Sequence, residues 1–126
     1  MSHYTRINTK ITDEQFLVRA LQKMGHQPLQ GRHSARGFNG RSIEVDVLIR
    51  TKSSGYDVGF RKEGKYYVCV ADWMGVNGIN QQEFIQNLNQ HYATLVVKDK
   101  LEKQGFALAE EVKVDGRIHL TLRRTG

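Results

Sequence analysis

The chain has 126 residues, of which 39% are hydrophobic and 25% charged, so we expect one folded domain over residues 1–126 and exclude wholesale disorder. Its single cysteine, Cys69, excludes an internal disulfide and a cysteine-rich zinc site. The net charge is +6, and the whole excess lies in residues 1–65, which hold twelve Lys and Arg against six Asp and Glu. A basic half of this kind favours acidic partners.

Hydrophobic periodicity and turn residues predict the secondary structure. In chain order they predict a strand over Tyr4–Ile11, a helix over 13–24, a short strand over 26–30, a loop over 31–40, strands over 43–50, 56–60 and 65–72, a connection over 72–80, a helix over 81–104, and strands over 106–114 and 117–124. We expect Thr12 or Asp13 to cap the first helix and Gly25 to end it. Asn80 is a fitting cap for the second helix, and Asp115-Gly116 is typical of a type I′ hairpin turn.

The element order is therefore β-α-β-β-β-β-α-β-β. Short turns join most neighbouring strands, so antiparallel pairing is expected to dominate. Each helix carries a single apolar stripe, which needs one face of a sheet to cover it. The sequence predicts an α+β fold, a two-layer sandwich in which two helices cover one face of a mainly antiparallel sheet.

No motif of a known reaction is present. The sequence has no G-x-S-x-G, Walker A or G-x-G-x-x-G pattern. Its five histidines include no pair at helical i,i+4 spacing, and Cys69 lies between apolar strand residues with no base nearby in sequence. We therefore predict no catalytic residues, no metal site and no cofactor.

The basic first half supplies the predicted binding residues. The segment GRHSARGFNG, residues 31–40, combines arginines with glycines, so its backbone and guanidinium groups could reach phosphates or carboxylates. Its cations and those of the first helix are expected to share one positive surface: Arg32, Arg36, Arg41, Arg19 and Lys23. The alternative is a solvated loop of ordinary positive charge.

The connection over residues 72–80 is a second candidate for recognition, because Trp73 and Met74 are bulky apolar residues in a glycine-rich turn. Trp73 is a predicted partner-binding residue if its indole is exposed. The alternative is that both residues plug the end of the core. A further alternative is a small enzyme with its site near Asp72 and Trp73.

Several segments together resemble a known family. They are the opening MSHYTRINTKI, the first helix that ends at Gly25, the strand GYDVGF, the connection VADWMGV and the closing LTLRR. In combination these are similar to the small conserved hypothetical family of cyanobacteria and red-lineage plastids, the thirty-fifth hypothetical chloroplast open reading frame. The resemblance runs from Met1 to about Arg124 and implies a photosynthetic cell, in the cyanobacterial cytoplasm or the plastid stroma. It implies no activity and no site residues.

The charge asymmetry favours a non-catalytic binding or assembly module over an enzyme. Its expected partner is acidic, either RNA or an acidic protein. No signal peptide is evident, and no apolar run approaches the roughly 20 residues that a membrane span needs. The sequence does not indicate an oligomeric state.

Overall fold

The computed structural model describes residues 4–53 and 55–125 and has an α+β fold, as predicted. Its elements are β1 (Thr5–Asn8), α1 (Glu14–Lys23), β2 (Leu29–Arg36), the 3-10 turn η1 (Phe38–Gly40), β3 (Ser42–Arg50), β4 (Asp57–Glu63), β5 (Tyr66–Ala71), the 3-10 turn η2 (Trp73–Gly75), α2 (Gln81–Lys103), β6 (Phe106–Val114) and β7 (Arg117–Arg124). Neither helix of the described chain has the length and apolar character needed to cross a membrane.

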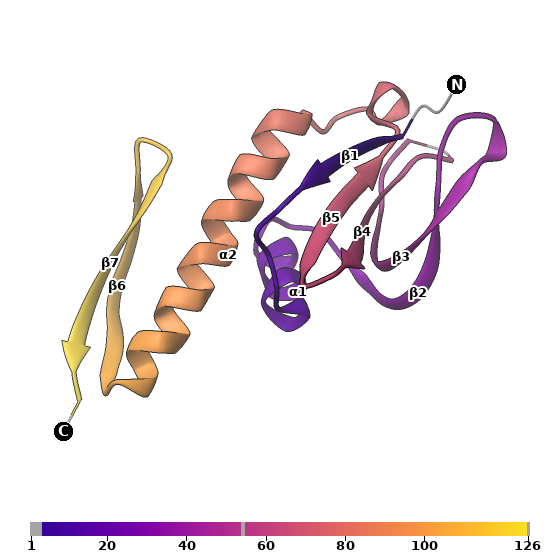
Figure 1. Ribbon diagram of the computed structural model, residues 1–126. Helices are drawn as coiled ribbons and strands as arrows, with labels where there is room; N and C mark the ends of the chain where they lie inside the picture. The colour runs from indigo at the N-terminus through magenta and orange to yellow at the C-terminus, as the bar shows by residue number, and fades with distance from the viewer. Residues whose placement is uncertain (1–3, 54, 126) are drawn as a thin grey trace.

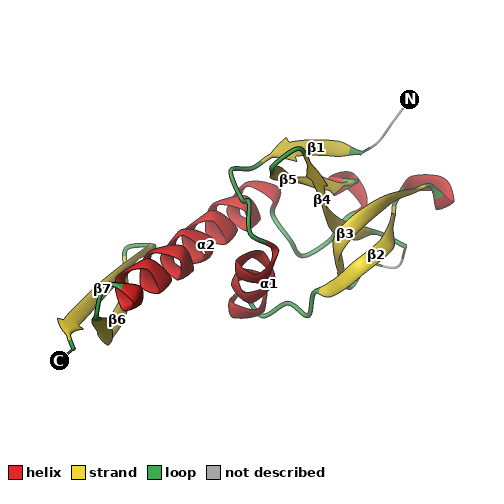
Figure 2. Ribbon diagram, turned by 60° about the horizontal axis from the view of Figure 1, so that its bottom comes forward, coloured by secondary structure: helices red, strands yellow, loops and turns green. Residues whose placement is uncertain are grey.

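Five strands form one antiparallel sheet in the order β1-β5-β4-β3-β2. Both helices pack on the same face of this sheet, as predicted (Figures 1 and 2). Leu17 and Leu21 of α1 and Leu88 of α2 are completely buried there against Phe60 and Cys69 of the sheet. Burial of these side chains supplies the main apolar stabilisation of the fold.

The opposite face of the sheet is also covered. A second core forms there from Ala35, Val45, Leu48, Val68 and Val70. The Tyr4 hydroxyl, beside β1, lies 2.9 Å from the carbonyl oxygen of Ala35 in β2, although β1 and β2 are the two outer strands. The sheet therefore curls until its outer strands approach each other at one end, and this encloses the second core.

The predicted short strand over 26–30 and loop over 31–40 are wrong, because β2 continues to Arg36. Gly31 has a φ of +97°, and the register with β3 shifts between Gln30 and His33. A glycine at such a bulge lets a strand continue past an irregular residue, so the glycine content alone was misleading. The true turn is η1, two residues after the strand.

The predicted helix caps are confirmed. Asp13 accepts a hydrogen bond from the Phe16 backbone N–H, and Asn80 accepts one from the Glu83 N–H, each at 3.0 Å. These side chains satisfy donors that the first turn of a helix leaves open. They fix where α1 and α2 begin, and the loop that precedes α2 borders the site described below.

The last two strands do not join the five-stranded sheet. β6 and β7 form a separate hairpin that packs on the far half of α2 (Figures 1 and 2). Its turn has positive φ at Asp115 (51°) and Gly116 (75°), as the predicted type I′ turn requires. We call residues 96–124, the end of α2 together with this hairpin, the arm, and the rest of the described chain the body.

Candidate functional site: a cationic cleft between three loops

A cleft of about 590 Å³ opens where three loops of the body meet. The α1–β2 loop contributes residues 25–27 and Leu29 begins the strand that follows it; Arg50 ends β3 and residues 51–52 follow it; and the η2–α2 loop contributes residues 77–79. Volumes between roughly 300 and 1,000 Å³ are typical of sites for small molecules and cofactors. The cleft therefore has the size of a ligand site.

The end of helix α1 forms the first wall of the cleft. The Gly25 N–H donates to the Gln22 carbonyl and the His26 N–H donates to the Leu21 carbonyl, both at 3.0 Å, with Gly25 at a φ of +92°. This Schellman arrangement turns the chain sharply and fixes His26 at the rim. The His26 ring stands edge-on to Phe84 at 5.5 Å, and burial lowers the pKa of His26, so its neutral form is favoured.

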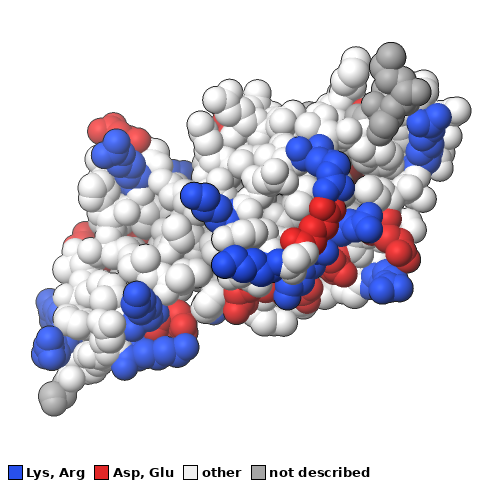
Figure 3. Space-filling view, viewed as in Figure 1, with Lys and Arg blue, Asp and Glu red and all other residues white. Residues whose placement is uncertain are grey.

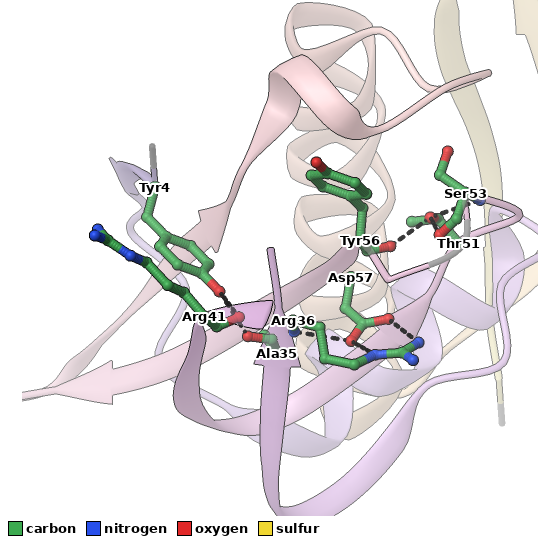
Figure 4. Close-up of polar contacts among 8 residues, drawn as sticks. All are labelled: Tyr4, Ala35, Arg36, Arg41, Thr51, Ser53, Tyr56 and Asp57. Carbon is green, nitrogen blue, oxygen red and sulfur yellow. Dashed lines mark hydrogen bonds and ion pairs between the residues drawn. The ribbon is translucent and has the colours of Figure 1, made fainter. Parts of the chain in front are cut away.

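The other two walls are fastened to each other. The Thr51 hydroxyl donates to the Tyr56 carbonyl at 2.5 Å (Figure 4). The Asn77 N–H donates to the Ser53 hydroxyl at 2.6 Å and so joins the two loops. Behind them the Tyr56 ring packs so closely on Gly75 that an added Cβ would lie 1.9 Å from Cε1 of the ring. The cleft is thus shaped by contacts within the chain and needs no ligand to hold it open.

Arg50 and Lys52 give the cleft its charge. Both are exposed, and within the described residues neither lies within 4.0 Å of a carboxylate. The described lining residues include no Asp or Glu. An anion that enters this cleft would therefore meet two positive charges without displacing a carboxylate from either one.

Asp57 lies opposite Arg50 in the ladder of β3 and β4. Its carboxylate is nevertheless hydrogen-bonded by a different residue, Arg36. Its carboxylate accepts three hydrogen bonds from Arg36: from the backbone N–H at 2.9 Å, from Nε at 2.9 Å and from Nη2 at 3.1 Å (Figure 4). Burial acts to raise the pKa of Asp57, but these bonds and the charges of Arg36 and Arg50 outweigh it and hold the pKa below 3.8. Arg36 neutralises Asp57, which leaves Arg50 available to a ligand.

A smaller hollow of about 370 Å³ adjoins the cleft and shares His26, Gly78 and Ile79 with it. Its far side is formed by His91 of α2 and Lys113 of the arm. Burial lowers the pKa of His91, and the positive charges of Lys113 and Lys23 lower it further. Glu83 also lines this hollow, so its charge is mixed and the carboxylate-free lining is confined to the described residues of the cleft itself.

The arginines of the predicted binding loop lie in different settings. The Arg36 guanidinium is engaged with Asp57, whose side chain is fully buried. Arg32 is exposed on β2 and lines a hollow of mixed charge. The other charged residues of that hollow are Glu44, Asp46, Arg61 and Lys62. Arg41 is exposed, and its carbonyl oxygen lies 2.8 Å from the Tyr4 hydroxyl. Over the sheet in Figure 3, positive and negative side chains alternate.

The two predicted cations of α1, Arg19 and Lys23, have different neighbours. The Arg19 guanidinium lies 5.5 Å from the centre of the Phe16 ring. Lys23 lies close enough to His91 and Glu111 for its charge to lower the pKa of both. Of the five predicted cations, Lys23 is therefore the one whose charge acts on a residue of the hollow beside the cleft, namely His91.

Asp72 and Trp73, the residues proposed for recognition or catalysis, directly follow strand β5. Asp72 is 1% exposed, and its Oδ2 accepts the Phe38 N–H at 3.0 Å. Its Oδ1 and the indole Nε1 of Trp73 are buried without a hydrogen-bond partner among the described residues. Trp73 is half-buried, and its ring lies 5.8 Å from Phe84, while Met74 next to it is 90% exposed.

Within the described part of the chain, no three His, Cys, Asp or Glu residues are grouped to hold a metal ion.

Sequence reasoning missed the residues that line the cleft. The segment from Thr51 to Gly55 has the composition of a turn, and His26 follows a helix end, so each loop by itself resembles ordinary turn chemistry. One signal was available, the cations Arg50 and Lys52 at a strand end, with no acid between Asp46 and Asp57. What the sequence could not supply is the meeting of three loops that are far apart along the chain.

Comparisons with known proteins give a family and no activity. The family described as "Protein of unknown function (DUF1257)" matches residues 20–121. An uncharacterized protein ycf35 from Cyanophora paradoxa is 34% identical over 98% of each chain. Proteins of the same name from Pyropia yezoensis and Trieres chinensis are each 31% identical, over 98% and 84% of both chains respectively. No solved structure matches.

Proposed function

The chain belongs to the DUF1257 family of proteins of unknown function, and from its own residues we propose that it is a non-catalytic binding module that holds an acidic partner at the cationic cleft. The candidate partners are RNA and an acidic protein, and the residues that would make contact first are Arg50 and Lys52. The similarity to ycf35 proteins supports the expected setting in a photosynthetic cell. The plastid or cyanobacterial compartment is part of the same proposal.

One observation carries this proposal: two exposed cations share a cleft whose described lining has no carboxylate. Arginine presents a planar fork to phosphate or carboxylate, and lysine adds a compact charge. Lys23 and Lys113 act on His91 in the adjoining hollow, but Glu83 lines that hollow too, so the charges that favour an anion are those of the cleft itself. The net charge of +6 adds attraction at longer range.

A reaction centred on Asp72 and Trp73 has weaker support. Asp72 is almost fully buried, and one of its carboxylate oxygens is occupied by a backbone N–H. Neither residue lines the cleft or the adjoining hollow within the described chain. A general acid or base must reach the proton that it transfers, and this carboxylate is turned into the protein.

The experiment that tests the proposal measures binding of labelled single-stranded RNA and of polyglutamate at two salt concentrations. The test variant is the double substitution Arg50→Gln and Lys52→Gln. The matched control is Lys62→Gln with Lys65→Gln, which removes the same charge from exposed positions of the β4–β5 hairpin. We expect the cleft variant to weaken binding by about tenfold or more, since it removes charge-assisted hydrogen bonds, and the control to change it by much less.

The salt dependence identifies the partner. Binding of RNA should fall steeply as salt rises, because phosphate contacts release counterions. An acidic protein should show a gentler dependence, mainly through its association rate. Equal weakening by the two double variants would mean that net charge alone drives binding, and absence of binding to either polymer at low salt would refute the proposal.

A further inference from the structure

The cleft joins its positive charge to an apolar wall. Leu29 is 40% exposed although it begins strand β2, and it lines the cleft together with the half-buried Ile79. Leu29 pairs with Leu48 in the ladder of β2 and β3, and the part of its side chain that stays exposed faces the cleft. A simple anion makes no use of such an apolar surface, whereas a ligand with an apolar part does. The combination fits a ligand that carries an anionic group on a flat apolar body.

Two side-chain amides complete the described lining. Gln27 and Asn77 are exposed at the cleft, on the α1–β2 and η2–α2 loops. Each amide offers an N–H donor and a carbonyl acceptor, the pair of groups needed to hydrogen-bond the edge of a heterocyclic base. Arg50 and Lys52 belong to the third loop, so the charge and the amides enter the cleft from different loops.

We infer that the cleft recognises a nucleoside 5′-phosphate unit. The phosphate binds Arg50 and Lys52, and the base lies against Leu29 and Ile79 with its edge towards the amides. The cleft volume of about 590 Å³ accommodates one such unit. This inference rests on the proposed function and gives it a chemical identity: a nucleotide, either free or within single-stranded RNA.

The Asp57–Arg36 ion pair explains how Arg50 can bind a phosphate although a carboxylate lies opposite it in the ladder. If Asp57 were unpaired, its carboxylate would attract Arg50, its partner across the ladder, and would repel phosphate. Because Arg36 donates three hydrogen bonds to that carboxylate, Arg50 keeps its charge for the ligand. Arg36, which was predicted to touch the partner directly, has its guanidinium group on Asp57.

The test compares the affinities of four probes for the full chain: adenosine 5′-monophosphate, adenosine, inorganic phosphate and an RNA tetranucleotide. The variants are Leu29→Ser, which removes the apolar wall, and Arg50→Gln, which removes the phosphate contact. The control is Leu108→Ser, because Leu108 is 39% exposed on the hairpin and so matches Leu29 in exposure. Amide chemical shifts of residues 25–27, 29, 50–52 and 77–79 report where each probe binds.

We expect the monophosphate to bind at least about tenfold more tightly than inorganic phosphate, a difference of about 1.4 kcal/mol, because its base buries apolar surface against Leu29 and Ile79 that phosphate cannot cover. Leu29→Ser should remove most of that preference and leave phosphate affinity unchanged, Leu108→Ser should alter neither, and Arg50→Gln should weaken both ligands. A tetranucleotide that binds more tightly than the free nucleotide would identify RNA as the source, and the reverse would identify a free nucleotide.

Failure of the inference and failure of the proposed function give different results. Equal affinity for monophosphate and inorganic phosphate, or a preference that survives Leu29→Ser, overturns the nucleotide assignment and leaves an anion site. Binding of polyglutamate at the cleft without binding of any nucleotide also overturns the nucleotide assignment, and it favours an acidic protein as the partner. If neither polymer nor any phosphate probe binds, both proposals are overturned.

Discussion

The body and the arm are built from the same kinds of element but are stabilised very differently. In the body, four of the seven residues of β4 and five of the six of β5 are buried. In the arm, none of the described residues of β6 and β7 is buried, and Val112 and Val114 are 39% and 47% exposed. The hairpin is covered only on the side that packs on α2 (Figure 1).

The difference shows where this chain can tolerate change. A two-stranded hairpin is marginally stable by itself, so the arm depends on its attachment to α2. The body has a core on each face of its sheet, and the cleft is built from loops tied to that framework. A ligand site on the body therefore has a rigid support, whereas the arm can open locally without unfolding the cleft.

The largest expected effect is a loss of core packing in the body. Leu88 of α2 is fully buried in the cluster that joins both helices to the sheet. Leu88→Ala should lower the free energy of unfolding by about 2–5 kcal/mol, because it leaves a cavity. Urea denaturation followed by circular dichroism gives the value.

The matched substitution in the arm is Leu108→Ala, at a side chain that is 39% exposed. It removes the same atoms, but solvent already reaches this position, so we expect a loss below about 1 kcal/mol. If Leu88→Ala and Leu108→Ala lowered the free energy of unfolding equally, the contrast between a packed body and a loosely covered arm would be wrong.

The ion pairs of the two regions form a second contrast, and the body again should show the larger effect. Asp57 has a fully buried side chain that Arg36 satisfies, and Asp57→Asn should cost about 1–3 kcal/mol, as expected for lost hydrogen bonds to a charged group. Because the folded pKa of Asp57 is depressed, its contribution is present above about pH 4 and is lost as pH falls through the folded pKa.

The measurement for Asp57 is the free energy of unfolding from pH 7 to pH 3 for the wild type and Asp57→Asn. The gap between the two should narrow as pH falls below about 4, since protonation gives the wild type a neutral side chain as well. A gap that stayed constant with pH would mean that the charge of Asp57 contributes nothing to stability.

Local signals in the sequence were sufficient for most of the body's elements. Alternation, caps and turn pairs predicted both helices, the β4–β5 hairpin and the type I′ turn of the arm, and each depends on residues close together in the chain. The predicted loop over 31–40 failed because Gly31 serves a bulge inside a strand. Glycine has several conformational uses, and only the pairing partner decides between them.

Long-range contacts decide the remaining features, which could not be predicted. Nothing in the segment 106–124 indicates that its hairpin packs on α2 alone, because its alternating pattern suits any antiparallel sheet. The pairing of Arg36 with Asp57, 21 residues later, likewise depends on how the strands meet. The cleft that we propose as the site therefore uses Arg50 and Lys52, and a binding role for the predicted arginines stays a prediction.

The smallest expected effect is the loss of the arm's own ion pair, between Lys98 of α2 and Glu111 of β6, whose atoms are 2.5 Å apart. Glu111 is 37% exposed at its side chain, so solvent screens the pair and Glu111→Gln should cost less than about 1 kcal/mol. The effect should be local: amide hydrogens of β6 and β7 should exchange faster, while those of β4 and β5 keep their protection. If the body's amides lost protection equally, the arm would be unfolding together with the body, and the two regions would form one cooperative unit.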